Sequence, residues 1–250
     1  MQMAHGQLYM FGAYCAYFAS YSFGLGYFES LILSTVLIGA FGILLEKYFF
    51  HPFLDDPDRG MIVSLSLVLI LQTVAAVFFA GTTKVHHNPF SQVQNIAGIT
   101  IPLDRLVIII ISIVLVTALF LFINLTRTGQ SMVAVSQDRQ AAALQGINIA
   151  RVSSIGMMIG CGLAAAAGAL VGSMLSLDTT MGDFALAKGI AVIVLGGLGS
   201  LPGAVIGGLF LGLIDGVIPT LISSQMASMI GFAIVIVILI VRPQGLMGHE

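Results

Sequence analysis

Long stretches without a charged residue are the feature that most limits what this 250-residue chain can fold into. Each is close to the roughly 20 residues that an α-helix needs to cross the hydrocarbon core of a bilayer. With 58% hydrophobic residues, the chain also carries more apolar surface than one water-soluble core could bury. The first five stretches are residues 8–28, 30–45, 61–83, 106–126 and 152–177. The sequence therefore predicts a membrane protein with several helical spans.

A sixth apolar stretch, residues 189–241, is long enough for more than one crossing and contains one charged residue, Asp215. It is interrupted by GGLGSLPG at residues 196–203 and by Pro219. We expect two short helical arms joined at the Gly-Ser-Leu-Pro turn, and a last span over residues 225–241. The predicted fold class is an all-α polytopic membrane protein. It would be a single transmembrane domain over residues 1–250, with about seven transmembrane helices or six plus a re-entrant pair.

Several classes of function are disfavoured by what the sequence lacks. A net charge of −2 with nine Lys and Arg residues gives no basic patch for nucleic acid. Cys15 and Cys161 lie in apolar stretches, so we expect neither a disulfide framework nor a metal site. There is no phosphate-binding G-x-x-x-x-G-K-[ST] loop, and His51, His86 and His87 belong to no recognisable catalytic set. We therefore expect no enzyme activity and no cofactor in this chain.

The distribution of Lys and Arg predicts the orientation of the spans, because these residues favour the cytoplasmic side. When loops are assigned alternately to the two sides, six of the nine cationic residues fall on one side. That side, taken as cytoplasmic, holds Lys47, Arg59, Arg127, Arg139, Arg151 and Arg242, against Lys84, Arg105 and Lys188 on the other. The first residues lack a basic segment and a cleavage site, so we expect the first helix to be retained. The expected location is the cell inner membrane.

The segment AVSQDRQAAALQGIN, residues 134–148, is unusually polar for this chain. Ser136 or Asp138 can cap the start of a helix, residues 140–145 are good helix formers, and Gly146 is a typical stop. A helix of two turns is marginal in water, so it should gain its order by packing on something else. It is either a loop helix packed on its own protein or a docking element for a partner.

Four motifs occur in order along the chain. They are AHGQLYMFGAY at residues 4–14, TRTGQSMVAVSQDRQAAALQGIN at 126–148, VLGGLGSLPGAVIGGLFLG at 194–212 and RPQGLMG at 242–248. Together they resemble the permeases of branched-chain amino-acid ABC transporters, the LivH type. Members of that family usually have another apolar helix before the AHG motif, and this chain is expected to be a shortened form or to have its start placed late.

The resemblance implies that residues 127–150 are a cytoplasmic coupling segment, whose short helix rests on an ATP-hydrolysing subunit. The implied coupling residues are Gln137, Asp138, Arg139, Gln140, Ala141, Ala142 and Gly146. Arg139 and the glutamines would make the polar contacts, and the alanines would allow close approach. Gln140 stands where the family commonly has Glu, so a hydrogen bond would replace a salt bridge there.

The resemblance also implies the function and the partners. The chain would be one permease of an importer for branched-chain or related amino acids, paired with a homologous second permease, two ATP-binding subunits and an extracytoplasmic substrate-binding protein. Permeases for urea or short amides have very similar motifs and are the alternative. A stand-alone channel or secondary transporter is less favoured, because it would need coupling carboxylates inside the spans.

Candidates for the translocation pathway are polar or helix-breaking residues within the spans. They are Gln72, Gly196, Gly197, Gly199, Pro202 and Asp215. Two alternatives stay open for this set. Gln72 is equally expected to make a hydrogen bond between helices, and the glycines are equally expected to serve close helix packing.

Overall fold

The computed structural model of the chain describes residues 2–54, 56–79, 93–96, 99–197, 199–220, 223–242 and 244–247. Its contacts group into two compact units, Met1–Asp183 (unit 1) and Phe184–Glu250 (unit 2). The single transmembrane domain over residues 1–250 stays a prediction.

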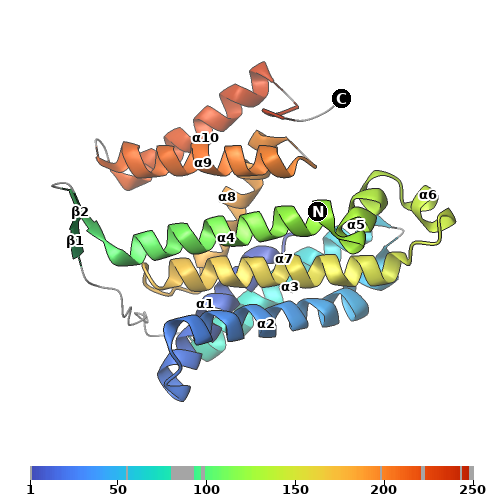
Figure 1. The fold of residues 1–250 in the computed structure, drawn as a ribbon, viewed down its shortest axis with the longest axis horizontal. Helices are drawn as coiled ribbons and strands as arrows, with labels where there is room; N and C mark the ends of the chain where they lie inside the picture. The colour runs from blue at the N-terminus through green and yellow to red at the C-terminus, as the bar shows by residue number, and fades with distance from the viewer. Residues whose placement is uncertain are drawn as a thin grey trace. The chain divides into compact units, whose positions relative to one another are not determined.

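Unit 1 is built almost entirely from α-helices (Figure 1). Its elements are α1 (His5–Phe23), α2 (Tyr27–Leu45), the π-helix η1 (Glu46–Phe50), the 3-10 helix η2 (His51–Phe53), α3 (Pro57–Phe79), β1 (Val93–Ile96), β2 (Ile99–Pro102), α4 (Leu103–Leu125), α5 (Arg127–Gln137), α6 (Arg139–Leu144), α7 (Ile149–Gly172) and the start of α8 (Met181–Gly196). The first five apolar stretches of the sequence correspond to α1, α2, α3, α4 and α7, as expected.

A β-hairpin and one helix of unit 1 were not expected from the sequence. Strands β1 and β2 form an antiparallel hairpin in which Val93 lies opposite Pro102 and Ile96 opposite Ile99. Helix α5 adds three turns before the short cytoplasmic helix that the sequence predicts. His86 and His87, which the sequence assigns to the loop before this hairpin, lie outside the described residues.

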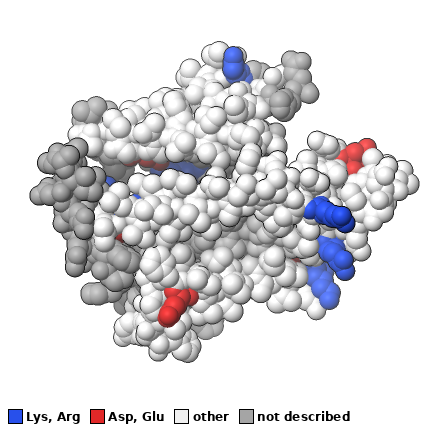
Figure 2. All heavy atoms as spheres, in the orientation of Figure 1, with Lys and Arg blue, Asp and Glu red and all other residues white. Residues whose placement is uncertain are grey.

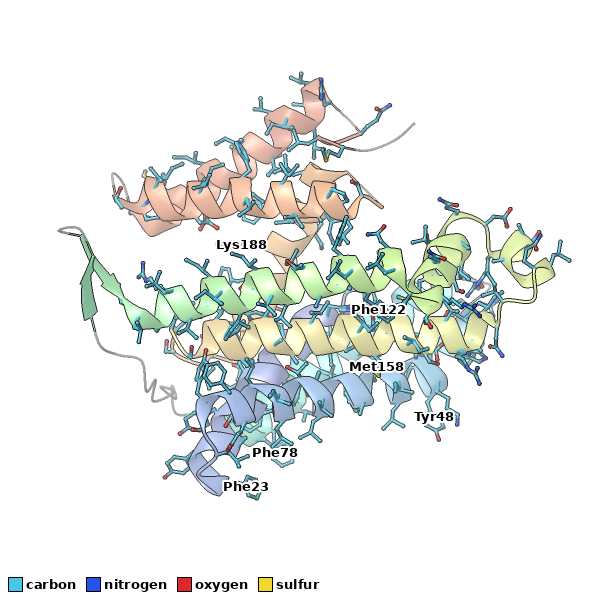
Figure 3. All side chains as sticks on the ribbon, in the orientation of Figure 1. Phe23, Tyr48, Phe78, Phe122, Met158 and Lys188 are labelled. Atoms are coloured by element: carbon cyan, nitrogen blue, oxygen red, sulfur yellow. The ribbon has the colours of Figure 1, made fainter. Side chains whose placement is uncertain are left out.

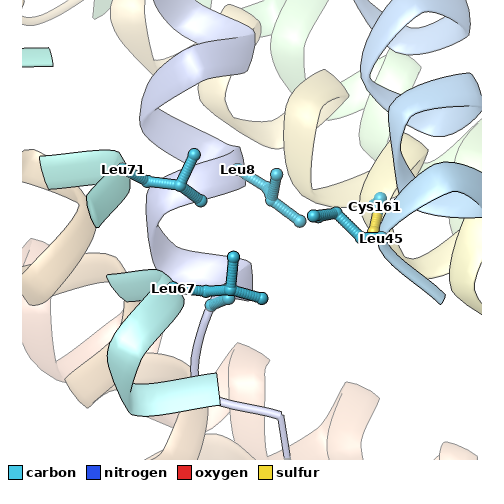
Figure 4. Close-up of a cluster of buried hydrophobic side chains, with 6 residues drawn as sticks. Leu8, Leu45, Leu67, Leu71 and Cys161 are labelled. Carbon is cyan, nitrogen blue, oxygen red and sulfur yellow. The ribbon is translucent and has the colours of Figure 1, made fainter. Parts of the chain in front are cut away.

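Small residues let the helices of unit 1 pack backbone against backbone. A Cβ on Gly12 of α1 would lie 2.3 Å from the Cα of Ala165 in α7, and a Cβ on Gly168 would lie 1.9 Å from the carbonyl oxygen of Tyr9. No larger residue fits at these crossings without moving a helix, which is the usual way that membrane helices associate closely. Beside them, α1, α2, α3 and α7 meet in a buried apolar cluster (Figure 4) of Ala4, Leu8, Leu45, Leu67, Leu71 and Cys161.

The outer surface of the helices is apolar. Figure 3 shows Phe23, Phe78 and Tyr48 pointing away from unit 1, and their exposed fractions are 77, 75 and 65%. Five helical segments among the described residues are long and apolar enough to cross a membrane: Tyr27–Phe53, Asp58–Phe79, Leu103–Leu125, Ile149–Gly172 and Leu201–Thr220. Such surfaces are stable against lipid, so the chain is an all-α, multi-pass membrane protein, as predicted.

Cationic side chains gather at one end of unit 1, the end that carries α5 (Figure 2). Hydrogen bonds between Ser154 and Glu46, and between Arg139 and Leu54, bring the start of α7, the end of α2 and helix α6 together at this end. Five of the six cations assigned to the cytoplasm belong to unit 1. They lie in η1 and in the first turns of α3, α5, α6 and α7: Lys47, Arg59, Arg127, Arg139 and Arg151. Their clustering supports the predicted orientation.

Unit 2 contains the rest of α8, α9 (Leu201–Val217), the 3-10 helix η3 (Ile218–Thr220) and α10 (Ser224–Val241). These match the two expected arms and the expected last span. The arms are antiparallel and touch through glycine, since a Cβ on Gly203 would lie 2.1 Å from the carbonyl oxygen of Gly196.

Candidate functional site

Helix α1 begins near the middle of α7, not at its end. The Nε2 atom of His5, the first residue of α1, lies 3.0 Å from where a Cβ on Gly160 would stand, and Gly160 is midway along α7. The backbone N–H groups of Met3 and Ala4 donate to Oγ of Ser64, a fully buried residue of α3, at 2.6 and 3.3 Å. Ser64 thus accepts from donors that the start of a helix leaves without partners.

The first turn of α8 reaches this same level and brings a carboxylate between α1 and α3. Gln7 Nε2 donates to Oδ1 of Asp183, and Gln72 Nε2 donates to Oδ2, both at 2.9 Å. Gln7 is 1% exposed, whereas Asp183 is exposed. Gln72 therefore makes the interhelical hydrogen bond that was one of its two expected roles. We call Gln7, Gln72 and Asp183 the carboxylate–amide site.

A close backbone contact holds the first turn of α8 in place. A Cβ on Gly182 would lie 2.6 Å from the carbonyl oxygen of Gly6 and 3.1 Å from Oε1 of Gln7, so glycine is required for this approach. Oε1 of Gln7 is itself buried and accepts no hydrogen bond from the described residues. Buried polar atoms without a partner are uncommon and call for a structural or functional explanation.

The polar segment predicted from the sequence forms a helix with defined ends. The carboxylate of Asp138 caps α6 by accepting from the N–H of Ala141 at 3.0 Å, and Gly146 ends the segment with a φ of 80°. Of the two caps that the sequence allowed, Asp138 is the one used, because Ser136 lies inside α5. One face of α6 is covered, with Ala142 buried, while Leu144 on the other side is 89% exposed. Gln137, Asp138, Gln140, Ala141 and Gly146 are exposed as well.

Helix α6 is tied to the connection between α2 and α3. Arg139 donates from Nη1 to the carbonyl oxygen of Leu54, just after η2. At the start of that connection the buried carboxylate of Glu46 accepts from Oγ of Ser154 in α7 at 2.5 Å, and its other oxygen lies 3.3 Å from Nδ1 of His51. Hydrogen bonds therefore join α6 to the end of this connection, and α7 to its start. Arg139 faces its own protein, and its contact with an ATPase subunit stays a prediction.

The glycine-rich motif of unit 2 forms a turn that the C-terminal segment closes. Gly197 and Gly199 have φ values of 101° and 86°, which only glycine adopts easily. The N–H groups of Leu246 and Met247 donate to the carbonyl oxygens of Leu195 and Gly196 at 2.8 and 3.0 Å. The segment RPQGLMG therefore satisfies carbonyl groups left open at the end of α8.

Two further pathway candidates also have structural partners in unit 2. Pro202 lies in the first turn of α9, where its missing N–H costs nothing, next to the capping residue Ser200. Asp215 accepts from Nζ of Lys188 at 2.6 Å, which joins α9 to α8 by an ion pair. Gly196 packs closely against Gly203 and Gly207, whereas a Cβ on Gly199 would meet nothing within 4 Å. A role of these residues in the pathway stays a prediction.

Sequence reasoning missed Gln7, Asp183 and Gly182. The charge of Asp183 lies only a few residues before a long apolar stretch, so it reads as part of a polar loop. The signal that could have found it is the distance along the chain: only eight residues separate the end of α7 from the start of α8, at Met181. That connection is too short for an independent outer domain, and it returns the chain into the helices of unit 1.

Comparison with known proteins gives the family. Residues 1–239 match the family model described as branched-chain amino acid transport system / permease component. The chain is 29% identical over 270 residues to the high-affinity branched-chain amino acid transport system permease protein LivH of Escherichia coli (strain K12), covering 100% of this chain and 86% of that protein. It is 28% identical over 267 residues to BraD, the corresponding protein of Pseudomonas aeruginosa, with the same coverage.

A shorter similarity extends to a sugar permease. The fructose import permease protein FrcC of Rhizobium meliloti is 34% identical over 111 residues, which cover 42% of this chain and 31% of that protein. No solved structure matches the chain. Because the family match spans nearly all of the helices described above, the chain belongs to the family of branched-chain amino acid transport system permease components.

Proposed function

We propose that this chain is the transmembrane permease subunit of an ATP-binding cassette importer and forms half of the translocation pathway for branched-chain or related amino acids. The observation that carries the proposal is α6, a short helix capped at both ends, held on one face by its own protein and open on the other. A two-turn helix with an exposed leucine at the cationic end of a membrane protein is suited to docking on a soluble partner.

The mechanism is alternating access driven from the cytoplasm. ATP-driven approach of two nucleotide-binding subunits moves α6. The spans that are joined to α6 then move with it. Helix α5 leads to α4, and Asn148 caps the start of α7. Arg139 links α6 to Leu54 in the connection that follows α2, and Glu46 links the start of that connection to Ser154 of α7. Because each link is a hydrogen bond or a direct chain connection, α6 and the cytoplasmic ends of these spans shift together.

The remaining partners follow from the importer type. The assembly lies in the cell inner membrane. A homologous second permease completes the pathway, two ATP-binding subunits supply the energy, and an extracytoplasmic binding protein delivers the substrate. The pathway itself is assigned to Gln72, Asp215 and the turn of Gly196, Gly197, Gly199 and Pro202. A charged side chain or an open backbone group within the spans is costly against lipid and needs water or protein as its neighbour. A translocation pathway provides both.

The cargo has one main alternative, urea or a short amide. Relatives of this chain include proteins named for branched-chain amino acids and two named for fructose, so the common helices accommodate more than one cargo. Full-length similarity to LivH and BraD favours branched-chain amino acids.

Uptake of radiolabelled leucine, with urea in parallel, tests the proposal in cells that express the chain with its partner genes. We compare the wild type with Leu144→Ser and Gly146→Pro, which change the open face and the end of α6. Leucine uptake should fall about tenfold or more in both variants, because each removes a docking contact or distorts the docking helix. ATPase subunits should also co-purify less with these variants.

Leu125→Ser is the matched control, since Leu125 is 74% exposed at the same end of unit 1 but outside α6. Its uptake should equal that of the wild type. Unchanged uptake in both α6 variants would refute the coupling role and favour a stand-alone channel or transporter. Uptake of urea alone would keep the importer and change the cargo.

A further inference from the structure

The carboxylate–amide site of unit 1 lies deep within the spans. Gln7 follows His5 by two residues, and His5 stands level with the midpoint of α7, so Asp183 lies within about one helical turn of that level. Gln72 reaches the same carboxylate from the middle part of α3. A charged side chain at such depth faces water or protein, because contact with lipid is too costly.

Resting on the proposed function, we propose that the carboxylate of Asp183, held by Gln7 and Gln72, binds the α-ammonium group of the transported amino acid. The hydrogen bonds favour a cation. Each glutamine donates one N–H to a different carboxylate oxygen, so both oxygens of Asp183 keep lone pairs that can accept from a ligand. The two amides are neutral, and within the described part of the chain no cationic side chain forms an ion pair with Asp183.

An ammonium group has the complementary chemistry. It carries one positive charge and three donors, and a charge-assisted hydrogen bond to a carboxylate is about twice as strong as a neutral one. Asp183 is exposed and can be reached, in contrast to a carboxylate buried for structural reasons alone. The described residues contain no group of three His, Cys, Asp or Glu side chains that could hold a metal ion, so a metal is not the favoured ligand.

The unpartnered Oε1 of Gln7 is the second observation that points to a donor ligand. Gln7 is 1% exposed, its amide is directed at Asp183, and its oxygen accepts nothing from the described residues. That oxygen is covered while Gly182 lies against Gly6. A shift of the first turn of α8 away from α1 would expose it beside Asp183 and give the ammonium group a second acceptor.

Photolabelling tests the site directly. The assembled importer in lipid vesicles is labelled with a leucine analogue that carries a diazirine, and labelled peptides are identified by mass spectrometry. Label should appear on peptides that contain Gln7, Gln72 or Asp183. Asp183→Asn should lower this labelling about tenfold or more, as expected for loss of a charge-assisted hydrogen bond. Glu29→Gln, the same chemical change at an exposed carboxylate in the first turn of α2, should leave it unchanged.

Two competitors show which end of the substrate is recognised. Isopentylamine keeps the ammonium group of leucine, and 4-methylpentanoate keeps its carboxylate. Isopentylamine should compete with the label in the wild type and lose this effect in Asp183→Asn, whereas 4-methylpentanoate should compete in neither. Equal competition by both compounds in the wild type would overturn the proposal.

A double variant separates binding from folding. Asp183→Asn with Gln72→Asp moves the carboxylate to the neighbouring position and keeps one charge in the site, so part of the labelling should return. Co-purification of the partner subunits checks assembly of every variant. If the wild type takes up leucine and Asp183→Asn is labelled like the wild type, the site is wrong and the importer stands. If the wild type neither takes up leucine nor is labelled, the proposed function and the site both fail.

Discussion

Asp183 in unit 1 and Asp215 in unit 2 are both aspartates at helix contacts, yet their surroundings differ in charge. Asp215 is bound by the ammonium group of Lys188 at 2.6 Å, so its charge is neutralised within the protein. Asp183 is bound by two neutral amides at 2.9 Å, which bring no opposite charge. The sequence singles out Asp215 because it stands alone in an apolar stretch. The structure shows that the isolated Asp215 is already paired, while Asp183, at the edge of a polar loop in the sequence, forms no ion pair with the residues that the structure describes.

The largest expected difference in stability between the two units comes from substitution of two glycines of α8, Gly182 in unit 1 and Gly189 in unit 2. Gly182→Ala places a methyl group 2.6 Å from the carbonyl oxygen of Gly6, and overpacking of this kind costs about 1–3 kcal/mol. Gly189→Ala, on the same helix with nothing within 4 Å, should be stabilising by about 0.5–1 kcal/mol. Thermal unfolding of the purified protein in detergent measures both. Equal unfolding midpoints for the two variants would mean that α8 does not pack closely against α1 at Gly182.

A double-mutant cycle on Lys188 and Asp215 tests whether that pair is self-contained. Each single change to Ala leaves one charge without its partner and should cost about 1–2 kcal/mol. The double change removes both charges and should recover most of the loss. Unfolding midpoints of the four proteins give the coupling energy. A double variant as unstable as the sum of the single variants would show that the two charges have other partners.

Gln7→Met removes two opposing contributions from the carboxylate–amide site. The variant loses a hydrogen bond to a carboxylate but also the buried, unpartnered Oε1, so the net change in stability should lie within about 1 kcal/mol. Leucine uptake should nevertheless fall. Ser34→Ala is the comparison, because its buried Oγ donates to the carbonyl oxygen of Gly12 at 2.7 Å and has no such compensation. If Gln7→Met unfolds far earlier than Ser34→Ala, the role of Gln7 is structural.

The smallest effect on stability is expected at the outer edge of the site. Gln72→Ala should change the free energy of unfolding by less than about 0.5 kcal/mol, since Gln72 is only half-buried. Its leucine uptake should fall several-fold, because Asp183 loses one of the two amides that orient it. Thr73→Ala, on an exposed neighbour that bonds only within α3, should take up leucine like the wild type. Similar uptake in both variants would limit the site to Gln7 and Asp183.

Local features of the sequence predicted the elements well. Uncharged stretches predicted α1, α2, α3, α4 and α7. The Gly-Ser-Leu-Pro turn predicted the two arms, and Asp138 and Gly146 predicted the ends of the segment around α6. Each of these depends on residues close together in the chain, such as a cap, a glycine with positive φ or a run of apolar side chains.

Contacts between distant residues account for what the sequence did not show. The carbonyls of Leu195 and Gly196 are satisfied by Leu246 and Met247, so two motifs that the sequence keeps apart form one structure. Gln7 and Asp183 are separated by 176 positions, and no periodicity relates them.

The sequence by itself determined that this chain is a helical membrane protein, where its long apolar stretches lie, and to which family it is similar, because apolar length and capping are local properties. Only the tertiary structure decided that Arg139 faces its own protein, that Lys188 pairs with Asp215, and that two amides bind the carboxylate of Asp183. The physical reason is that electrostatic partners are set by which helices cross, and helix crossing is set by glycine contacts between segments far apart in the chain.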